Sequence, residues 1–315
     1  MRGVHVPRIA GDGHVSLVSI TEPDPKQFRP LIKQWSTPIA RYGDAAEMLR
    51  NEKLDAVMIG SPHALHFEQA RLALEKNLHV MVEKPLTISS RDSAHLLRLV
   101  KRKNRMLLVS YQRHFSAPYV YGRELIRRGT LGELRGVVSY ISQDWSEAEG
   151  WRLDPKMSGG GMFMDTGSHL VAATLWMTGL EPIDVHARMD LAGMKADINA
   201  VVNVRFKSGA LGTLNTFGNA AFHDECIAIH GSRGVLTFHQ HGWQIRQVLL
   251  NNKPLKVPAR VKDTTPDAAF FRWIRNGGRG YELPHFALQV ARVSEAAVES
   301  AGKGRTVRVA KTAGA

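Results

Sequence analysis

This 315-residue chain has a single cysteine and lacks long apolar runs. Its one cysteine, Cys226, excludes an internal disulfide framework and a four-cysteine zinc site, and fits a reducing compartment. No apolar run approaches the roughly 18 residues of a membrane span. The first residues, MRGVHVP, lack the apolar core of a signal peptide. We therefore expect a cytoplasmic protein without a membrane partner and without a metal site.

Acidic residues are also in deficit. Lys and Arg number 42 against 29 Asp and Glu, a net charge of +13, which raises the question of a nucleic-acid partner. The excess is spread evenly, however, with +7 in residues 1–113 and +6 in residues 114–315. The densest run, residues 101–105, closes a predicted helix, where cations favour the negative end of the helix dipole. The distribution predicts no nucleic-acid partner, although a basic surface can steer anionic ligands such as nucleotides.

The first third of the chain alternates short apolar runs with helical patterns. The length of the whole chain and its ordinary composition, 43% hydrophobic and 23% charged, predict about two globular domains. Apolar strands separated by helices indicate a parallel sheet covered on both faces, a doubly wound α/β domain whose ligands sit beyond the carboxyl ends of the strands. The predicted strands are 15–20, 55–60, 79–83 and 106–111, and the predicted helices are 25–35, 45–51, 64–76 and 89–103.

The pattern changes near Arg113. A helix over 117–128, a long strand over 134–145 and a helix from about 162 to 178 precede six strand signals between 185 and 250. Two helices, 267–275 and 284–301, and a short strand at 306–309 follow. Consecutive strands with short turns predict a largely antiparallel sheet. We expect a Rossmann-like domain over residues 1–113 and an α+β substrate-binding and oligomerisation domain over residues 114–315.

Glu83-Lys84-Pro85 follows a predicted apolar strand. A lysine at a strand end near a nucleotide cleft can hydrogen-bond a substrate hydroxyl and lower the pKa of a neighbouring group. The proline can fix a sharp turn with a cis peptide bond. Taken alone, the segment is more often an ordinary strand-ending turn.

Asp165 and His169 begin the helix that follows Ser158-Gly159-Gly160-Gly161. Their i, i+4 spacing places both on one helix face, where a carboxylate and an imidazole together can bind a hydroxyl and remove its proton. The glycines permit close backbone approach to a ligand. The alternatives are a helix-start charge, a satisfied core histidine and a simple loop.

Glu22 lies two residues past the predicted strand 15–20. A carboxylate at the end of the second strand of a Rossmann unit accepts hydrogen bonds from an adenosine ribose and disfavours a 2′-phosphate. The alternative is a turn residue. Two further groups carry little chemistry on their own: His239 and His241 alternate along a predicted strand, and residues 223–225 are expected to form a turn rather than a ligand set.

Together these segments resemble the Gfo/Idh/MocA oxidoreductases, the glucose-fructose oxidoreductase and inositol dehydrogenase family. The resemblance covers nearly the whole chain. Five segments carry it, in the family's order: DAVMIGSPHALH at 55–66, HVMVEKPL at 79–86, YQRHF at 111–115, WRLDP at 151–155, and SGGG at 158–161 followed by DTGSH at 165–169.

The resemblance implies roles position by position. Lys84 would contact substrate and support proton transfer, Asp165 would bind substrate hydroxyls, and His169 would be the general acid and base. The residues implied to line the dinucleotide cleft or to reach the cofactor are Glu22, Ser61, Pro62, His66, Glu83, Lys84, Gln112, Trp151 and Arg152. The implied cofactor is NAD or NADP, with NAD favoured by Glu22, and relatives imply a homodimer or homotetramer.

The chain departs from the family at its start. The family begins with a strand and a Gly-x-Gly-x-x-Gly turn, whereas residues 1–10 here match the helix that follows that turn. Gly3 matches the last of the three glycines, and His5 matches a histidine just beyond it. Two explanations are open: a true start upstream, or loss of nucleotide binding with retention of the fold. The missing strand is central in such a sheet, so its neighbours would lose their hydrogen-bonding partners.

Three functions are consistent with these observations. The first is an NAD(P)-dependent oxidoreductase that transfers a hydride between nicotinamide and a sugar, inositol or polyol-like secondary alcohol. The second is an NAD-dependent glycosidase of the same family, which would show no net redox change. The third is a non-catalytic partner subunit that has lost nucleotide binding.

Overall fold

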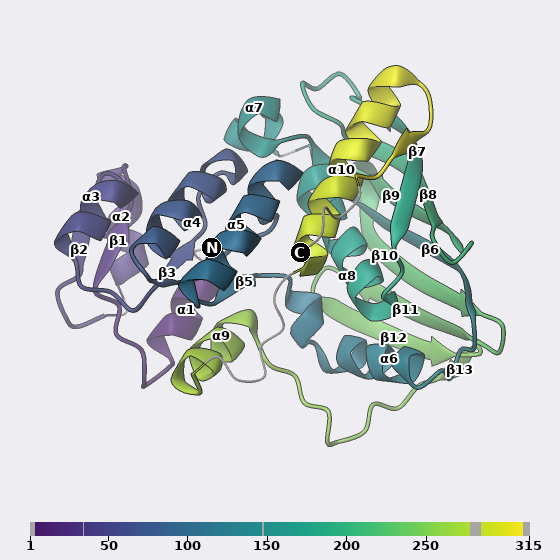
Figure 1. Cartoon of the computed structure of the whole chain (residues 1–315), viewed down its shortest axis with the longest axis horizontal. Helices are drawn as coiled ribbons and strands as arrows, with labels where there is room; N and C mark the ends of the chain where they lie inside the picture. Colours follow the sequence, from purple (N-terminus) through teal and green to yellow (C-terminus); the bar gives the residue numbers. More distant parts are fainter. Residues whose placement is uncertain (1–3, 34, 147, 278–284, 311–315) are drawn as a thin grey trace.

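The computed structural model describes residues 4–33, 35–146, 148–277 and 285–310. Figure 1 shows the parallel strands and their helices on one side of the molecule and a large sheet on the other. Gly3 lies outside the described residues, so its match to a glycine turn stays a prediction. No helix in the described ranges is long and apolar enough to cross a membrane.

The N-terminal strands are parallel but form two separate sheets. Strand β1 (Ser19–Thr21) pairs with β2 (Ala40–Tyr42), and β3 (Ala56–Ile59), β4 (His79–Val82) and β5 (Leu107–Val109) form a sheet in that order. Among the described residues, β1 and β3 are not paired with each other, so the two groups of strands stay apart at the position where the family has a further strand. The helices are α1 (His5–Ala10), α2 (Pro25–Ile32), α3 (Ala45–Asn51), α4 (His66–Glu75) and α5 (Ser90–Lys103).

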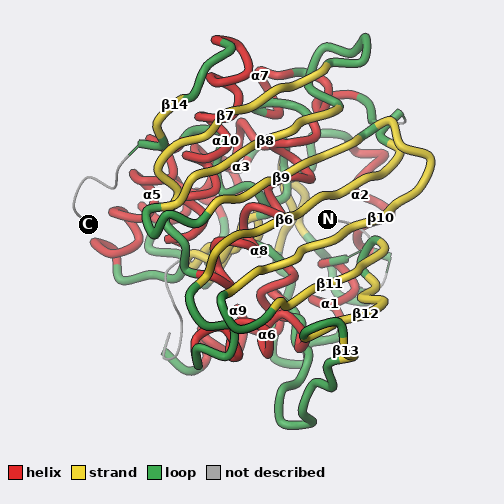
Figure 2. The backbone as a smooth tube through the Cα atoms, turned by 90° about the vertical axis from the view of Figure 1, so that its right-hand side faces the viewer, coloured by secondary structure: helices red, strands yellow, loops and turns green. Residues whose placement is uncertain are grey.

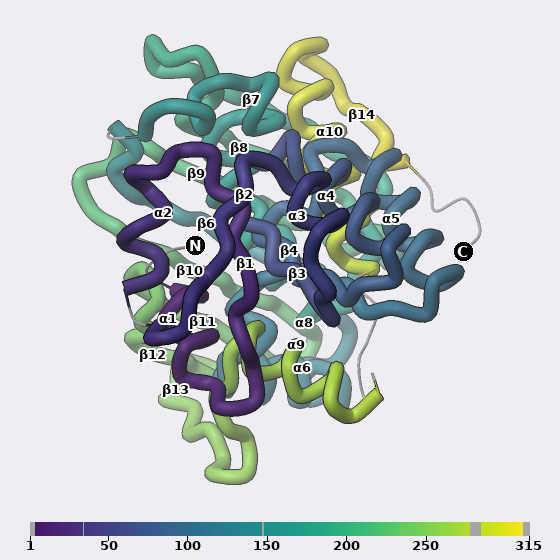
Figure 3. The backbone as a smooth tube through the Cα atoms, turned by 90° about the vertical axis from the view of Figure 1, so that its left-hand side faces the viewer, coloured from purple at the N-terminus to yellow at the C-terminus, as the bar shows by residue number. Residues whose placement is uncertain are grey.

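Both faces of the three-stranded sheet are covered, as expected of a doubly wound arrangement. Side chains alternate between the faces of a strand. Val80 and Val82 of β4 therefore join the core that includes buried residues of α4 and α5. Met81, between them, packs in a separate cluster with Phe270 and Phe271 of α9 (Pro266–Arg275). Figure 3 shows α4 and α5 on one side of β3 and β4, and α9 with α1 on the other.

The second sheet has nine strands and is largely antiparallel, as predicted. Its order in the described part of the chain is β13-β12-β11-β10-β6-β9-β8-β7-β14, and among these strands only β6 and β9 pair in parallel. The strands are β6 (Leu134–Asp144), β7 (Pro182–Asp190), β8 (Asn199–Phe206), β9 (Leu211–Phe217), β10 (Asn219–Gly231), β11 (Val235–His241), β12 (Gln244–Leu250), β13 (Lys253–Pro254) and β14 (Val307–Arg308).

Helices cover one face of this sheet and leave the other open. Ala200, Val202 and Val204 point from β8 into the core beneath α8 (Ser168–Thr178) and α10 (His285–Lys303), and α6 (Ala117–Arg127) packs on α8. The strands in Figure 2 lie in front of these helices, with their outer face toward the viewer. Val138, Val201, Leu211 and Phe217 are exposed large apolar side chains on β6, β8 and β9.

Three details differ from the sequence-based expectations. Strand β2 was not predicted, because ARY is too short to show a period. Residues 223–225 are not a turn but the middle of β10, which pairs with β6 there. The helix predicted from residue 162 starts as a π-helical turn, Phe163–Gly167, before α8. The division at residue 113 stays a prediction. The chain returns to the N-terminal sheet at α9 after β13, and β14 then adds a last strand to the second sheet beside β7.

Candidate active site

A cavity of about 410 Å³ opens at the carboxyl ends of β3, β4 and β5, where they face the second sheet. Gly60 and Ser61 follow β3, Glu83 and Lys84 follow β4, and Gln112 lies three residues beyond β5. Parallel strands bring these ends to one edge, which is where open α/β sheets bind ligands. Each loop therefore reaches the cavity because of its place after a buried strand.

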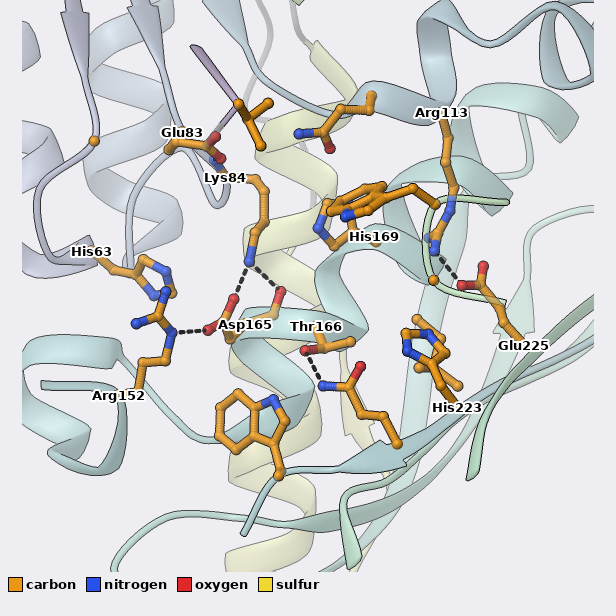
Figure 4. A pocket seen from close by; sticks show the side chains of 18 of the residues that line it. His63, Glu83, Lys84, Arg113, Arg152, Asp165, Thr166, His169, His223 and Glu225 are labelled. Carbon is orange, nitrogen blue, oxygen red and sulfur yellow. Dashed lines mark hydrogen bonds and ion pairs between the residues drawn. The ribbon is translucent and has the colours of Figure 1, made fainter. Parts of the chain in front are cut away.

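Lys84 and Asp165 form an ion pair in this cavity, as Figure 4 shows. The Nζ of Lys84 donates to the carboxylate of Asp165 and also to its main-chain oxygen at 3.0 Å. The Lys84–Pro85 peptide bond is cis, as the sequence suggested. Arg152 donates from Nε to the second carboxylate oxygen of Asp165 at 3.1 Å. Burial acts to raise the pKa of Asp165, but the charges of Lys84 and its neighbours outweigh it and hold that pKa well below its usual range. Asp165 is thus an ionised acceptor between two cations.

Backbone contacts fix the turn that carries Asp165. The buried carboxylate of Asp197 accepts the main-chain N–H groups of Gly161, at 2.7 Å, and Phe163, at 2.8 Å. A Cβ on Gly161 would lie 2.0 Å from the main-chain oxygen of Asp197, so only glycine fits. Gly159 adopts a φ of +79° beside Ile88. These two glycines permit close approach of protein backbone and side chain, rather than of a ligand.

His169 lies on the same side of the helix as Asp165 and also faces the cavity. Its ring meets Tyr111 and Trp243 edge-on, at centroid distances of 5.9 and 5.7 Å. Burial lowers the pKa of His169 well below its usual value, and the charges of Lys84 and Arg113 lower it further. A neutral imidazole beside a lysine–carboxylate pair can accept a proton from a bound hydroxyl.

His63 is a cavity residue for which sequence reasoning named no role, although it lies within a matched segment. It begins the 3₁₀ turn His63–Leu65, donates from Nδ1 to the main-chain oxygen of Ser158 at 2.9 Å, and meets Trp151 edge-on at 4.6 Å. Burial, with the nearby Lys84, lowers the pKa of His63 to about 3. Trp151 and Arg152 come from the 3₁₀ turn Gly150–Leu153, just before α7 (Pro155–Ser158), with the guanidinium of Arg152 over the Trp151 ring at 4.6 Å.

Most, but not all, of the predicted site residues meet in this cavity. Lys84, Asp165, His169, Ser61, Glu83, Gln112, Trp151 and Arg152 line it, whereas Glu22, Pro62 and His66 do not. His66 is fully buried, with Nδ1 2.9 Å from the Pro85 oxygen and Nε2 3.0 Å from the Ser61 oxygen. It therefore ties the loop after β3 to the loop after β4. Glu22 follows β1, where its carboxylate accepts the main-chain N–H of Asp24 at 3.1 Å.

The residues that form the far wall of the cavity had no role assigned from the sequence. Arg113, from the 3₁₀ turn Gln112–Phe115, forms an ion pair with Glu225 of β10, and His223 lies beside them. Burial raises the pKa of Glu225 to about 7, although the charge of Arg113 opposes this. The alternation along β10 is the sequence signal that could have placed Glu225 on the inner face. Glu225 lies two and four residues before the buried Ile227 and Ile229, so all three side chains point to the same face of the strand. Within the described ranges, no group of three or more His, Cys, Asp or Glu could hold a metal ion.

A Rossmann-like sheet whose strand ends meet a lysine, a carboxylate and a neutral histidine is typical of an oxidoreductase that uses a dinucleotide. Two family models match the chain. One is described as an oxidoreductase family with an NAD-binding Rossmann fold, over residues 3–111, and the other as a GFO/IDH/MocA C-terminal domain, over residues 119–237. The chain belongs to this family of oxidoreductases, which confirms the resemblance seen in the sequence.

The individual relatives described here are each less than 30% identical to this chain. The chain is 26% identical over 227 residues to a 1-carboxy-3-chloro-3,4-dihydroxycyclohexa-1,5-diene dehydrogenase of Comamonas testosteroni, covering 70% of this chain and 56% of that protein. It is 28% identical over 200 residues to myo-inositol 2-dehydrogenase of Thermotoga maritima, covering 61% and 59%. The solved structure of an aldose-aldose oxidoreductase from Caulobacter crescentus matches with a TM-score of 0.85 at 24% identity, covering 97% of this chain and 95% of that one, and shows the shared fold.

Proposed function

We propose that this protein is an NAD(P)-dependent dehydrogenase that transfers a hydride between nicotinamide and a secondary alcohol of a sugar, an inositol or a related polyol. The observation that carries the proposal is the meeting of Lys84, Asp165 and His169 in one cavity at the carboxyl ends of the parallel strands. The family supports the use of a nicotinamide cofactor. The named activities of relatives, on an inositol and on aldoses, support a polyhydroxylated substrate.

His169 is the proposed base. Its imidazole is neutral because its pKa is depressed, so it can accept the proton of the substrate hydroxyl when the alcohol is oxidised. Lys84 donates a hydrogen bond to the same oxygen and stabilises the negative charge that develops there. Asp165 holds Lys84 in place and accepts a hydrogen bond from a neighbouring hydroxyl. The bound nicotinamide would supply the hydride acceptor.

The cavity fits the nicotinamide end of a dinucleotide. Gly60 and Ser61 leave the backbone open at the end of β3, and Gln112 contributes a buried Oε1 without a partner, which can accept an amide N–H. Trp151 and Arg152 close the same side from the second domain. We favour NAD over NADP, because Glu22 follows β1 with a carboxylate that a 2′-phosphate would meet unfavourably.

The open face of the nine-stranded sheet supports a homodimer or homotetramer. Exposed apolar side chains on three adjacent strands are typical of an interface, since contiguous apolar patches are uncommon on the surfaces of monomers. We place the protein in the cytoplasm, because a single cysteine fits a reducing compartment.

Titration of the protein with NADH and with NADPH, followed by nicotinamide fluorescence, tests the proposal. Saturable binding with the tighter constant for NADH is the expected result, and oxidation of inositols and aldoses should then reduce NAD. The break between β1 and β3 favours a second candidate, a partner subunit without catalysis. That candidate expects no affinity for either nucleotide and no turnover with any polyol, so a saturable NADH signal coupled to turnover would exclude it.

A further inference from the structure

The cavity has a polar end that the proposed chemistry does not use. Arg113 and Glu225 form its wall, and both are buried, with 6% and 1% of their surface exposed. Figure 4 places them on one side of His169, while His63 and Arg152 lie on the opposite side, beyond Lys84 and Asp165. A ligand that reaches Arg113 and Glu225 must therefore extend past the reacting carbon.

Polar atoms without partners gather at this cavity. Eleven buried side-chain nitrogen and oxygen atoms of the described residues have no hydrogen-bond partner, and five of them belong to residues that line the cavity. Three of the five are Arg113 Nε, Arg113 Nη1 and Glu225 Oε1. Buried polar atoms are nearly always paired, because an unpaired one is costly. This end of the cavity therefore offers donors and an acceptor to a group that can use both.

The charges of the cavity are balanced although the chain is strongly basic. Apart from three histidines whose pKa values are lowered, its ionisable lining comprises three cations (Lys84, Arg113 and Arg152) and three carboxylates (Glu83, Asp165 and Glu225), in a chain whose net charge is +13. Above about pH 7, where its carboxyl group is ionised, Glu225 cancels the charge of Arg113 at the unused end. A carboxylate or phosphate placed there would gain from Arg113 and be repelled by Glu225.

Aromatic side chains line the cavity at both ends: Trp151 lies beside His63 and Arg152, and Trp243 lies beside His169. Trp145, Trp151 and Trp243 line the cavity. Trp243 follows Gly242 at the turn between β11 and β12, keeps 67% of its surface exposed, and still lies edge-on to His169. A large exposed apolar side chain at the mouth of a cavity loses water contact when a ligand covers it. Flat aromatic faces beside hydroxyl-binding groups suit a ring with C–H surface and polar substituents.

We infer that Arg113 and Glu225 form a substrate subsite that binds hydroxyl groups of a neutral ring polyol, at positions other than the carbon that reacts. A hydroxyl donates to Glu225 and accepts from Arg113, so one hydroxyl or two adjacent ones pair the orphaned atoms. The subsite selects neutral sugars over acidic ones. This inference rests on the proposed function, whose substrate class it narrows.

Calorimetric titration with D-glucose and D-glucuronate, which share a ring but differ in charge, tests the subsite. Both titrations are run with and without NADH, at about pH 8.5, where Glu225 is ionised because its pKa is about 7. The protein should bind glucose at least about tenfold more tightly than glucuronate, which corresponds to 1.4 kcal/mol. Glu225→Gln should reduce or reverse the preference for glucose over glucuronate, because the charge of Arg113 is then uncompensated.

Two further variants guard against a folding defect. Arg113→Gln combined with Glu225→Gln removes both charges, so it leaves no buried ion without a partner and should restore the preference for glucose. Glu124→Gln breaks a surface pair with Arg260 and should leave the ratio unchanged. Any of three results would overturn the subsite. The unchanged protein could bind glucuronate as tightly as glucose or more tightly, the ratio of the two affinities could stay the same in Glu225→Gln, or neither sugar could bind. Loss of NADH binding alone would instead contradict the proposed function, because the titration without nucleotide reports on the subsite independently.

Discussion

The imidazole of His5 lies with Nε2 2.5 Å from the Glu83 carboxylate, although 78 residues separate them in the sequence. The other ring nitrogen, Nδ1, lies 2.6 Å from Asp267 in the first turn of α9. Glu83 in turn accepts the main-chain N–H of Lys84 at 3.1 Å. One buried histidine thus connects α1, the loop that carries Lys84 and a helix from the C-terminal part of the chain.

This connection predicts a pH-dependent contribution to stability. Burial alone would lower the pKa of His5, but hydrogen bonds and charges from Asp267 and Glu83 outweigh it and raise that pKa to about 9. A histidine whose pKa is raised on folding stabilises fully below its unfolded value of 6.5, and the contribution is lost as the pH rises toward 9. At 1.36 kcal/mol per pKa unit the contribution is about 3 kcal/mol.

Urea unfolding of His5→Gln and of the unchanged protein, from about pH 6 to 9.5, measures this contribution. The difference in unfolding free energy should be largest at the acid end and shrink above pH 6.5. His14→Gln, at an exposed position, should show no such trend. A difference for His5→Gln that stays constant with pH would contradict the charged bridge.

Replacement of the lysine in the cavity should separate catalysis from folding. Lys84→Met removes the ion pair with Asp165 and the proposed hydrogen bond to the reacting oxygen, and Arg152 still pairs with the Asp165 carboxylate. We expect kcat to fall by about 10²- to 10⁴-fold. Lys76→Met, at an exposed position, should leave kcat unchanged. A Lys84→Met enzyme with normal kcat would remove Lys84 from the mechanism.

The depressed pKa of His169 predicts the acid limb of the pH profile. For alcohol oxidation, kcat should stay level as the pH falls through 6.5 and decline only well below it, because His169 stays neutral there. Measurement in Glu225→Gln removes a cavity carboxyl group whose pKa is raised to about 7 and whose titration would otherwise overlap this range. An inflection near pH 6.5 in that variant would show that His169 is more exposed to water than the structure indicates.

Crowding at the glycine loop predicts a local packing defect. Gly161→Ala places a Cβ 2.0 Å from the main-chain oxygen of Asp197, so the loop or the π-helical turn must move. We expect a loss of about 1–3 kcal/mol in unfolding free energy, together with lower activity because Asp165 moves with the turn. The matched control, Gly43→Ala, meets nothing within 4 Å and should leave both unchanged.

The open sheet face predicts how the oligomer can be disrupted. Leu211 is 61% exposed on β9, and Val201 is 41% exposed on the neighbouring β8. Leu211→Lys should convert the assembled protein to monomer, as measured by light scattering, because burying an unpaired charge in an interface is costly. Phe222→Lys, an exposed apolar position on β10, serves as a control for added charge alone. A monomer before any substitution would contradict the proposed interface.

Local patterns predicted most elements and the cavity residues Lys84, Asp165 and His169, whereas the resemblance to the family added Ser61, Gln112, Trp151 and Arg152. Apolar strands ending in Gly60, Lys84 and Gln112 indicated both the parallel sheet and the edge where its loops converge. The i, i+4 spacing of Asp165 and His169 indicated a shared face, which the cavity confirms. These predictions succeeded because each depends on residues close together in the sequence, through strand alternation and helix periodicity.

Other features were decided only by tertiary packing. The sequence by itself determined the α/β fold class, the ends of the parallel strands and the residue types at the carboxyl edge. It did not determine that His5 would meet Glu83 and Asp267, nor that Arg113 would meet Glu225, 112 residues away, because no local pattern encodes such pairs. The tertiary structure brought these charges together because the second sheet packs against the strand ends of the first, and it is this packing that gives the cavity its balanced charge.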